Sequence, residues 1–289
     1  RRVRCVGLER THRELAELGR SVRLEQVRAA VDRVDGLARA GMRVAVIEKG
    51  SMPSQLEATF DGRVSAIALG SKYILDDIGV WQGMAPHAEP ILDIRVSDGM
   101  APVFLHYDHH EVGTDPFGYI VENRHIRHAL QQAAGTLDTL SLFDNTSVEN
   151  FAADDAGVTL EIGQGTLRCR LLVGADGKHS KIRTMAGIKA VEWGYGQTAI
   201  VCTIAHEKSH HGLAQERFLP AGPFAVLPMQ GNRSSLVWVE PDDRIPIYME
   251  LNDNELAQEI SERVGDYLGD ITVAGKRFTH PLSLLHAKE

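Results

Sequence analysis

The spacing of apolar residues along the first half of the chain predicts helices alternating with strands. Over 24–38 these residues fall three or four positions apart, which is the spacing of one helix face. The continuous run over 44–47 is typical of a strand buried on both faces of a parallel sheet. The same reasoning predicts a helix over 64–83 and another that begins near Asn123.

The second half of the chain is dominated by strand patterns separated by Gly, Pro and Asp turns. A meander of three antiparallel strands is predicted over 141–173, after a strand pair over 91–107. The remaining strands are expected at 197–206, 214–219, 223–229, 234–240 and 271–280, with one helix at 253–268. This order predicts an α/β region followed by a second, mostly antiparallel sheet.

Composition narrows the classes of protein to consider. The 289 residues are 43% hydrophobic and 24% charged, which is ordinary globular usage. A net charge of -8 argues against nucleic acid as a partner, because phosphate binding needs clustered Lys and Arg. The three scattered cysteines, Cys5, Cys169 and Cys202, form no CxxC metal site and fit a reduced compartment.

An acidic residue, Glu48, ends the predicted strand over 44–47. In a dinucleotide-binding βαβ unit, such a residue accepts hydrogen bonds from the ribose hydroxyls. A solvated strand end is an equally good interpretation of Glu48 alone. The glycine-rich loop of such a unit should precede it by about 20 residues. The corresponding positions hold Glu25, Val27 and Ala30 instead.

A second motif is longer and more specific. An apolar strand over 171–173 runs into Gly174-Ala175-Asp176-Gly177, with Ser180 and Arg183 at fixed offsets on a starting helix. The simpler interpretation is a tight turn whose Asp caps the helix.

The string over 174–183 resembles the Asp-Gly motif of the class A flavoprotein monooxygenases, the para-hydroxybenzoate hydroxylase-like aromatic hydroxylases. Other segments match this family in order: 44–49, 61–69 and 119–130. The segment 217–228 resembles a hairpin of the ubiquinone-biosynthesis subgroup. The resemblance extends over about 37–285.

The resemblance implies a fold and a domain order. The fold would combine an FAD/NAD(P)-binding Rossmann-like domain of the glutathione reductase type, carrying a β-meander, with a mostly antiparallel β substrate domain. We expect an atypical segment over 1–36, FAD-binding regions over 37–80 and 115–190, substrate-sheet regions over 81–114 and 191–280, and a return to the FAD domain over 281–289.

The resemblance also assigns roles to individual residues. Glu48 would bind the FAD ribose, Arg63 and Arg124 would lie along the diphosphate and ribityl, and Asp176-Gly177 would approach the diphosphate with Arg183 supporting the loop. The substrate wall would include Phe218, Phe224, Val226 and Leu227. Plain packing in the sheet is an equally good interpretation of each of these four.

The function implied is hydroxylation of an electron-rich aromatic ring with FAD, NAD(P)H and O₂. The subgroup indicates a polyprenylated phenol as substrate, a cytoplasmic enzyme peripheral to the inner membrane surface, and association with other quinone-biosynthesis enzymes. A hydroxylase of a small soluble aromatic acid, or an inactive truncated flavoprotein, are the alternatives. A NAD-dependent dehydrogenase would need a parallel sheet that continues after residue 100. The antiparallel meander predicted over 141–173 argues against that class.

The absence of a glycine-rich loop and of a later Gly-Asp motif indicates a sequence incomplete at both ends. The Arg-rich, Lys-free first 40 residues fit an altered start of the reading frame. Histidines cluster at 106–110 and 206–211, but neither spacing matches a helical zinc motif, and no metal is expected.

Overall fold

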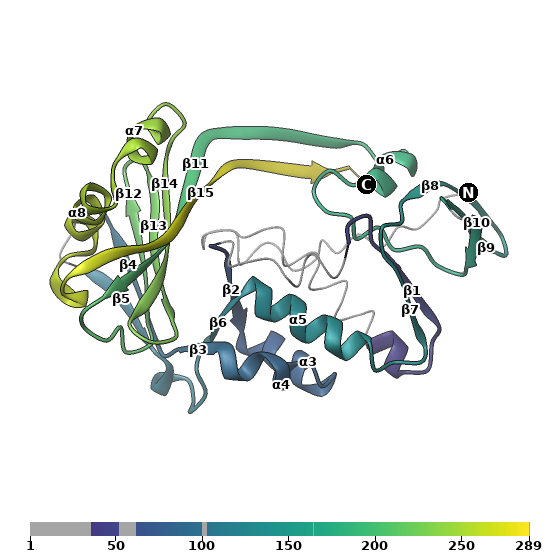
Figure 1. The fold of residues 1–289 in the computed structure, drawn as a ribbon, viewed down its shortest axis with the longest axis horizontal. Helices are drawn as coiled ribbons and strands as arrows, with labels where there is room; N and C mark the ends of the chain where they lie inside the picture. Colours follow the sequence, from purple (N-terminus) through teal and green to yellow (C-terminus); the bar gives the residue numbers. More distant parts are fainter. Residues whose placement is uncertain (1–35, 52–61, 100–102, 164, 289) are drawn as a thin grey trace. The chain divides into compact units, whose positions relative to one another are not determined.

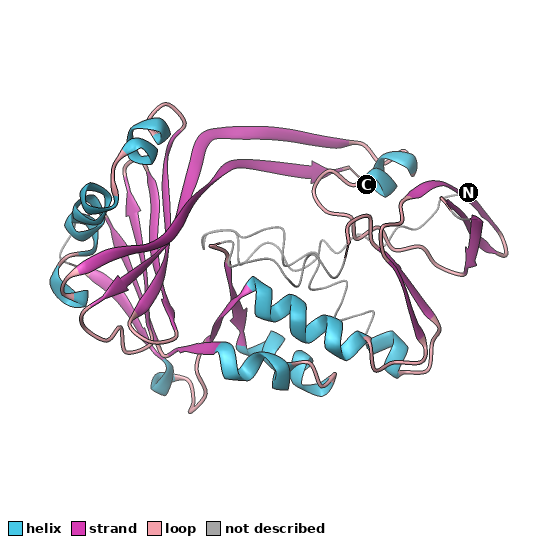
Figure 2. Ribbon diagram, in the orientation of Figure 1, coloured by secondary structure: helices cyan, strands magenta, loops and turns pink. Residues whose placement is uncertain are grey.

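The computed structural model describes residues 36–51, 62–99, 103–163 and 165–288. These residues divide into two compact units. Unit 1 comprises 1–58, 130–193 and 285–289, and unit 2 comprises 59–129 and 194–284. The chain passes between them within α5 (Asn123–Ala134), β11 (Ala190–His206) and β15 (Ile271–Ala287). Figures 1 and 2 show the elements of both units.

Unit 1 contains the predicted strand, β1 (Val44–Ile47), paired in parallel with β7 (Leu140–Phe143). Thr139 donates to the Ala38 carbonyl at 2.8 Å and ties the two chain segments together. Ala45 is exposed and the rest of β1 is half-buried, so the expected burial on both faces is wrong for the described residues. Within the described part of this sheet, β7 is the neighbour of β1.

The predicted meander is present in unit 1 as β8 (Val148–Asp154), β9 (Gly157–Ile162) and β10 (Gly165–Cys169). The expected strand over 141–153 is divided into β7 and β8. Asn145 has a φ of 47°, which no strand residue adopts, and it breaks the strand at this turn. A short helix, α6 (Lys181–Met185), follows the meander.

Unit 2 begins with a small antiparallel sheet in the order β2-β6-β3. Its strands are β2 (Val64–Ala68), β3 (Ala88–Ile91) and β6 (Gly118–Glu122). The expected helix over 64–83 is therefore wrong for its first five residues. Helical structure starts with α3 (Leu69–Asp77) and continues in α4 (Trp81–Met84) and the 3₁₀ turn η1 (Ala85–His87).

The helix expected near Asn123 is α5, and its predicted stripe of Ile126, Ala129, Leu130 and Ala133 is buried. Gly83 of α4 lies against this stripe. A Cβ at Gly83 would approach the Ala129 Cβ to 2.9 Å, so the two helices need a glycine at this position to pack this closely.

The larger sheet of unit 2 has seven strands in the order β15-β11-β14-β13-β12-β4-β5. The strands not yet bounded are β4 (Asp93–Asp98), β5 (Phe104–Asp108), β12 (Leu213–Leu219), β13 (Gly222–Met229) and β14 (Arg233–Pro241). Neighbours from β11 to β12 pair antiparallel, whereas β12 and β4 pair in parallel. A 3₁₀ turn, η2 (His109–Glu111), follows β5.

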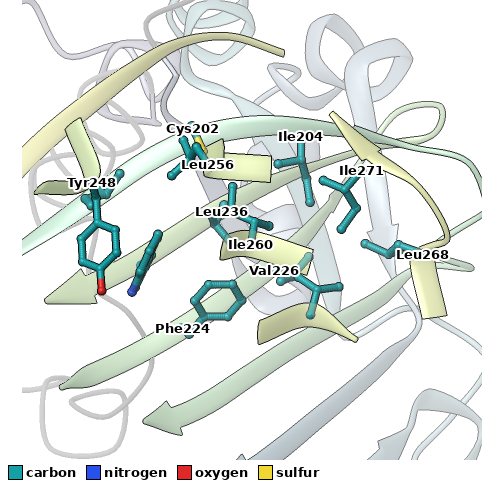
Figure 3. Packing of buried hydrophobic residues seen from close by; sticks show 13 residues of the cluster. Cys202, Ile204, Phe224, Val226, Leu236, Tyr248, Leu256, Ile260, Leu268 and Ile271 are labelled. Atoms are coloured by element: carbon teal, nitrogen blue, oxygen red, sulfur yellow. The ribbon is translucent and has the colours of Figure 1, made fainter. Parts of the chain in front are cut away.

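One face of this sheet is covered by α7 (Ile245–Glu250) and α8 (Asp253–Val264), followed by the 3₁₀ turn η3 (Asp266–Leu268). The side chains between them form the largest core of unit 2, shown in Figure 3. Its fully buried members include Trp238, Phe224, Leu256 and Ile260. Among the described helices, none combines the length and the apolar character needed to cross a bilayer.

Candidate functional site

Glu48 lies in unit 1, directly after the last residue of β1. The Glu48 amide donates to the Phe143 carbonyl at 2.9 Å, so the β1–β7 pairing continues to this residue. Its carboxylate oxygen Oε1 accepts a hydrogen bond from the Gly50 amide at 2.7 Å, which fixes the side chain at the carboxyl end of the strand. The remaining lone pairs can accept hydrogen bonds from a diol such as a ribose.

Asp176 lies in the loop of unit 1 between the meander and α6. Its Oδ2 accepts from the amides of Lys181 at 2.7 Å and Ile182 at 3.1 Å. Its Oδ1 accepts from the hydroxyl of Ser180. These bonds give Asp176 the helix-capping role that the sequence also allows, because they satisfy amides of the first turn.

The loop around Asp176 is closed by two further contacts. Ser180 is the N-cap of α6 and accepts from the Arg183 amide at 2.9 Å. The Arg183 guanidinium donates to the Lys178 carbonyl at 2.8 Å. Gly177 has a φ of 87°, which only glycine adopts without strain. The loop therefore presents a rigid backbone whose shape depends on Gly177.

Arg63 and Arg124 are brought together in unit 2 by the pairing of β2 with β6. The Asn123 amide donates to the Arg63 carbonyl at 3.1 Å, one residue beyond the last paired residues of the two strands. Asn123 is fully buried, and its Oδ1 accepts from the Ser65 hydroxyl at 3.0 Å. Its Nδ2 has no hydrogen-bond partner among the described residues.

Glu122, at the end of β6, is buried among positively charged and imidazole side chains. Its Oε2 accepts from the Arg124 Nε at 2.6 Å and lies 3.8 Å from the His125 Nε2, while its Oε1 lies 3.5 Å from the Arg233 Nη2. The pKa of His125 is lowered, first by burial and then by His87, while Glu122 opposes the shift. The rings of His87 and His125 stack with centroids 3.7 Å apart.

These residues line a cavity of about 210 Å³ in unit 2. Ligand pockets have volumes of roughly 300–1,000 Å³, so this cavity has room for part of a ligand rather than a whole dinucleotide. The guanidinium groups of Arg124 and Arg233 give it two fixed positive charges beside one buried carboxylate. The lining consists of His87, Ile120, Glu122, Arg124, His125, Met229, Gln230 and Arg233.

The four expected substrate-wall residues lie on opposite faces of the seven-stranded sheet. Phe224 and Val226 belong to the closed core under α7 and α8, where they are 1% and 2% exposed (Figure 3). Packing in this core accounts for Phe224 and Val226, and neither side chain is available to contact a substrate. Phe218 is 39% exposed, and Leu227 packs against the separate cluster between this sheet and the small sheet.

The histidines considered as metal ligands have mostly structural partners. His106 pairs with Asp93 at 2.8 Å, and His109 Nδ1 lies 2.9 Å from the Leu92 carbonyl. His206 and His210 are buried and bond to backbone carbonyls. Ligand atoms of Asp108, His109 and His110 lie within 4.8 Å of one another, on a turn that also uses Asp108 to accept the His110 amide.

Four motif positions singled out in the sequence lie outside the described residues. The glycine-rich-loop positions Glu25, Val27 and Ala30 lie in 1–35, and Asp61 of the matched segment lies in 52–61. Sequence reasoning also missed three buried polar residues: Glu122, Asn123 and Glu216. The signal for the first two was the polar pair at the junction of an apolar strand and a helix.

The fold defines a class of protein. The chain superposes on PqsL of Pseudomonas aeruginosa with a TM-score of 0.71 at 17% identity, covering 86% of this chain and 71% of that one. It superposes on the p-nitrophenol 4-monooxygenase PnpA of Pseudomonas putida with a TM-score of 0.67 at 18% identity, covering 90% and 66%. The chain therefore has the fold of flavin-dependent monooxygenases.

Residues 35–280 match the model of the FAD binding domain family, and the chain belongs to that family. It is 47% identical over 249 residues to the ubiquinone hydroxylase UbiL of Rhodospirillum rubrum, covering 86% of this chain and 58% of that protein. It is 33% identical to the 3-demethoxyubiquinol 3-hydroxylase of Escherichia coli, covering 87% and 65%. The chain thus spans less than two thirds of the length of these relatives.

Each unit, taken by itself, offers groups that suit a part of an FAD. In unit 2, the Nδ2 of buried Asn123 is a donor without an acceptor among the described residues, and Arg124, the next residue, supplies a cation. In unit 1, Glu48 offers a carboxylate at a strand end. Cations and amide donors suit the diphosphate and ribityl oxygens, and a carboxylate suits a ribose diol.

Proposed function

We propose that this chain carries the cofactor-binding residues and substrate sheet of an FAD-dependent monooxygenase that hydroxylates an electron-rich aromatic ring. The observation that carries the proposal is the 47% identity to a ubiquinone hydroxylase within a family match over 35–280. When bound, FAD supplies the redox chemistry that joins NAD(P)H oxidation to oxygen insertion. The protein supplies binding, orientation and a dry environment.

Each cofactor-binding residue has a role in this proposal. Glu48 accepts hydrogen bonds from the adenosine ribose. Arg63 and Arg124 neutralise the diphosphate, and the Asn123 Nδ2 donates to the same chain of oxygens. Asp176, Gly177 and Arg183 hold the loop that approaches the diphosphate, and the three bonds to Asp176 support a role in fixing that loop.

The proposed substrate is a polyprenylated phenol of ubiquinone biosynthesis, consistent with the names of the relatives. The face of the seven-stranded sheet that carries Phe218 and Leu227 suits an apolar ring. A substrate with a long apolar tail partitions into lipid, so we infer a cytoplasmic protein that works at the inner membrane surface, near other enzymes of the pathway. Sedimentation with vesicles of anionic phospholipid tests the membrane contact.

The experiment is a binding titration followed by a turnover assay. FAD is added to the purified full chain, and binding is followed by quenching of flavin fluorescence. Product formation from a short prenylphenol is then measured with ¹⁸O₂ and mass spectrometry. The proposal predicts saturable FAD binding and one labelled oxygen in the product. A folded chain that binds no FAD would falsify it.

Two variants make the titration specific. Arg124→Gln removes a charged hydrogen-bond donor and is expected to weaken FAD binding about tenfold or more. Arg168→Gln is the matched control, because Arg168 is an exposed arginine that pairs with Asp154 in the meander at 3.1 Å. If both variants weaken FAD binding equally, the loss reflects the net charge of the protein and not a contact made by Arg124.

A further inference from the structure

Glu216 lies in β12, on the face of the seven-stranded sheet turned away from α7 and α8. Its neighbours in register are Ala225 on β13 and Val96 on β4. The adjacent residue Arg217 points to the other face, where its guanidinium donates to the Val264 carbonyl at the end of α8 at 3.2 Å. Because side chains alternate along a strand, Glu216 shares its face with Phe218.

Glu216 is buried, and one of its two carboxylate oxygens is unsatisfied. The residue is 5% exposed, and Oε1 has no hydrogen-bond partner among the described residues. Buried carboxylates in proteins are almost always paired or hydrogen-bonded, because desolvation of an unpaired one is costly. An unsatisfied buried group of this kind in a native sheet calls for a specific explanation, and a donor on a ligand supplies one.

Two further unsatisfied groups lie on the same face. Ser235 and Thr203 are neighbours in register on β14 and β11, and Ser235 pairs with Leu227 on its other side. Both hydroxyls are buried, at 0% and 2% exposure, and neither has a hydrogen-bond partner among the described residues. Polar atoms without partners beside apolar side chains suit a ligand that combines an apolar body with oxygen substituents.

We propose that Glu216 binds the ring hydroxyl of the aromatic substrate and takes its proton as the ring is activated. This inference rests on the proposed function and names the residue that recognises the phenol. In the step, the phenol O–H bond breaks and an O–H bond forms on the Glu216 carboxylate. The electron pair stays on the phenolate oxygen, which donates into the ring and makes it more nucleophilic.

The environment of Glu216 suits this exchange. Burial, as the single cause, raises the pKa of the carboxyl from 4.5 to about 7. The pKa of Glu216 is therefore closer to that of a phenol, about 10, than the pKa of a solvated carboxyl group is. Proton transfer from the phenol to Glu216 is correspondingly less unfavourable. On the flanking strands, the side chains of this face are Val96, Ile94 and Asp98 on β4, and Ala225, Pro223 and Leu227 on β13.

Among those flanking side chains, Asp98 alone titrates. It is exposed at the end of β4, two residues from Val96. The described strands beside Glu216 therefore place no cation against its carboxylate. A neutral hydroxyl is the complementary ligand, because it can donate a hydrogen bond without bringing a charge into the sheet.

The test compares 2-prenylphenol with its methyl ether, which has the same shape but no O–H. Binding to the full chain is followed by tryptophan fluorescence from pH 5.5 to 8.5, without turnover. Wild-type protein is expected to prefer the phenol by about tenfold, and increasingly as the pH rises through about 7. Glu216→Leu should abolish the preference, and Glu216→Gln should keep part of it but lose the pH dependence.

Glu240→Gln is the matched control, because Glu240 is a buried carboxylate of the same sheet on the helix-covered side. It should bind both probes as wild-type protein does. Circular dichroism establishes that each variant is folded. Folded wild-type protein that does not distinguish the probes, or folded Glu216→Leu that still prefers the phenol, overturns the assignment.

FAD titration separates this inference from the proposed function. If FAD fails to bind but the phenol preference still depends on Glu216, the proposed function fails and the assignment of Glu216 stands. If labelled product forms and Glu216→Leu leaves kcat and the phenol preference unchanged, the proposed function stands and Glu216 has no part in it.

Discussion

The two faces of the seven-stranded sheet each bury a carboxylate, and the two carboxylates differ in their hydrogen-bond donors. On the helix-covered face, Trp238 donates to Glu240 at 2.8 Å, and the Arg263 guanidinium lies 4.2 Å from the indole centre. On the opposite face, Glu216 Oε1 and the hydroxyls of Ser235 and Thr203 are buried without partners in the described part of the chain. Glu240 Oε2 and the Tyr267 hydroxyl are unpartnered there too, on the helix-covered side. The comparison teaches that the two buried carboxylates of this sheet are held differently: an indole N–H donates to Glu240, whereas Oε1 of Glu216 has no donor among the described residues.

The largest expected effect comes from opening the core on the helix-covered face. Trp238→Ala removes a fully buried indole that contacts Phe224 and Tyr248, and should cost about 3–5 kcal/mol of unfolding free energy. Urea denaturation measures the loss. Phe218→Ala, on the opposite face and 39% exposed, should cost less than about 1 kcal/mol. Equal losses would erase the distinction between the faces.

The next effect concerns the unsatisfied carboxylate. Because the pKa of Glu216 is raised from 4.5 to about 7, the folded state holds a proton that the unfolded state has released between these values. Stability is therefore lost as the pH rises through this window, by up to roughly 3 kcal/mol. Glu216→Gln should match wild-type protein near pH 4.5 and exceed it above pH 7.

Denaturant titrations from pH 4.5 to 8.5 measure this difference, with Glu240→Gln as the comparison on the other face. If the stability of Glu216→Gln runs parallel to that of wild-type protein from pH 4.5 to 8.5, Glu216 is not a buried carboxylate with a raised pKa.

A smaller effect is expected in unit 1, where the Asp-Gly loop has its polar atoms satisfied. Asp176→Ala removes the acceptor of the Lys181 and Ile182 amides and should cost about 1–3 kcal/mol. Hydrogen exchange of those two amides reports the change directly. Asp154→Ala is the control, because Asp154 is an exposed turn residue that accepts from the Ala156 amide at 2.8 Å. If the Lys181 and Ile182 amides still exchange slowly in Asp176→Ala, the loop keeps its conformation without the Asp176 carboxylate.

The smallest effect concerns a helix that covers the closed face. Asn252 caps α8 and forms a capping box with Glu255, so Asn252→Ala should cost about 1 kcal/mol. Asn254→Ala, in the first turn, should stay within about 0.5 kcal/mol. Thermal unfolding followed by circular dichroism distinguishes them, and a larger loss for Asn254 would count against the cap.

Much of this fold follows from local patterns in the sequence. The strand over 44–47, the meander and the antiparallel sheet follow from apolar runs between Gly, Pro and Asp turns. The strand over 64–68 was assigned to a helix, because an apolar run of five residues beside a helical pattern shows no distinguishing period. What makes it a strand is its pairing with 118–122, a contact distant in sequence.

The candidate site was harder to predict than the fold. Motif offsets indicated Glu48 and Asp176. Glu48 directly follows β1, but Asp176 lies in a loop, because β10 ends at Cys169 and the strand expected over 171–173 is not formed. Phe224 and Leu227 were both expected in the substrate wall, but side-chain alternation along β13 puts them on different faces. Which face the helices cover depends on residues 245–264, far along the chain. The unsatisfied state of Glu216 depends on neighbours from two other strands, β4 and β13, so no local sequence pattern predicts it.

The thiol of Cys202 lies in the closed core, where burial raises its pKa to about 12. It is inert toward alkylating reagents while the sheet and helices stay together, because the thiolate is the reactive form. Its labelling rate therefore measures how often the core opens, against the faster reaction of half-buried Cys169. The alkylation rate of Cys202 thus reports transient opening of the helix-covered core. A ligand that binds the opposite face and stabilises the sheet should slow this alkylation.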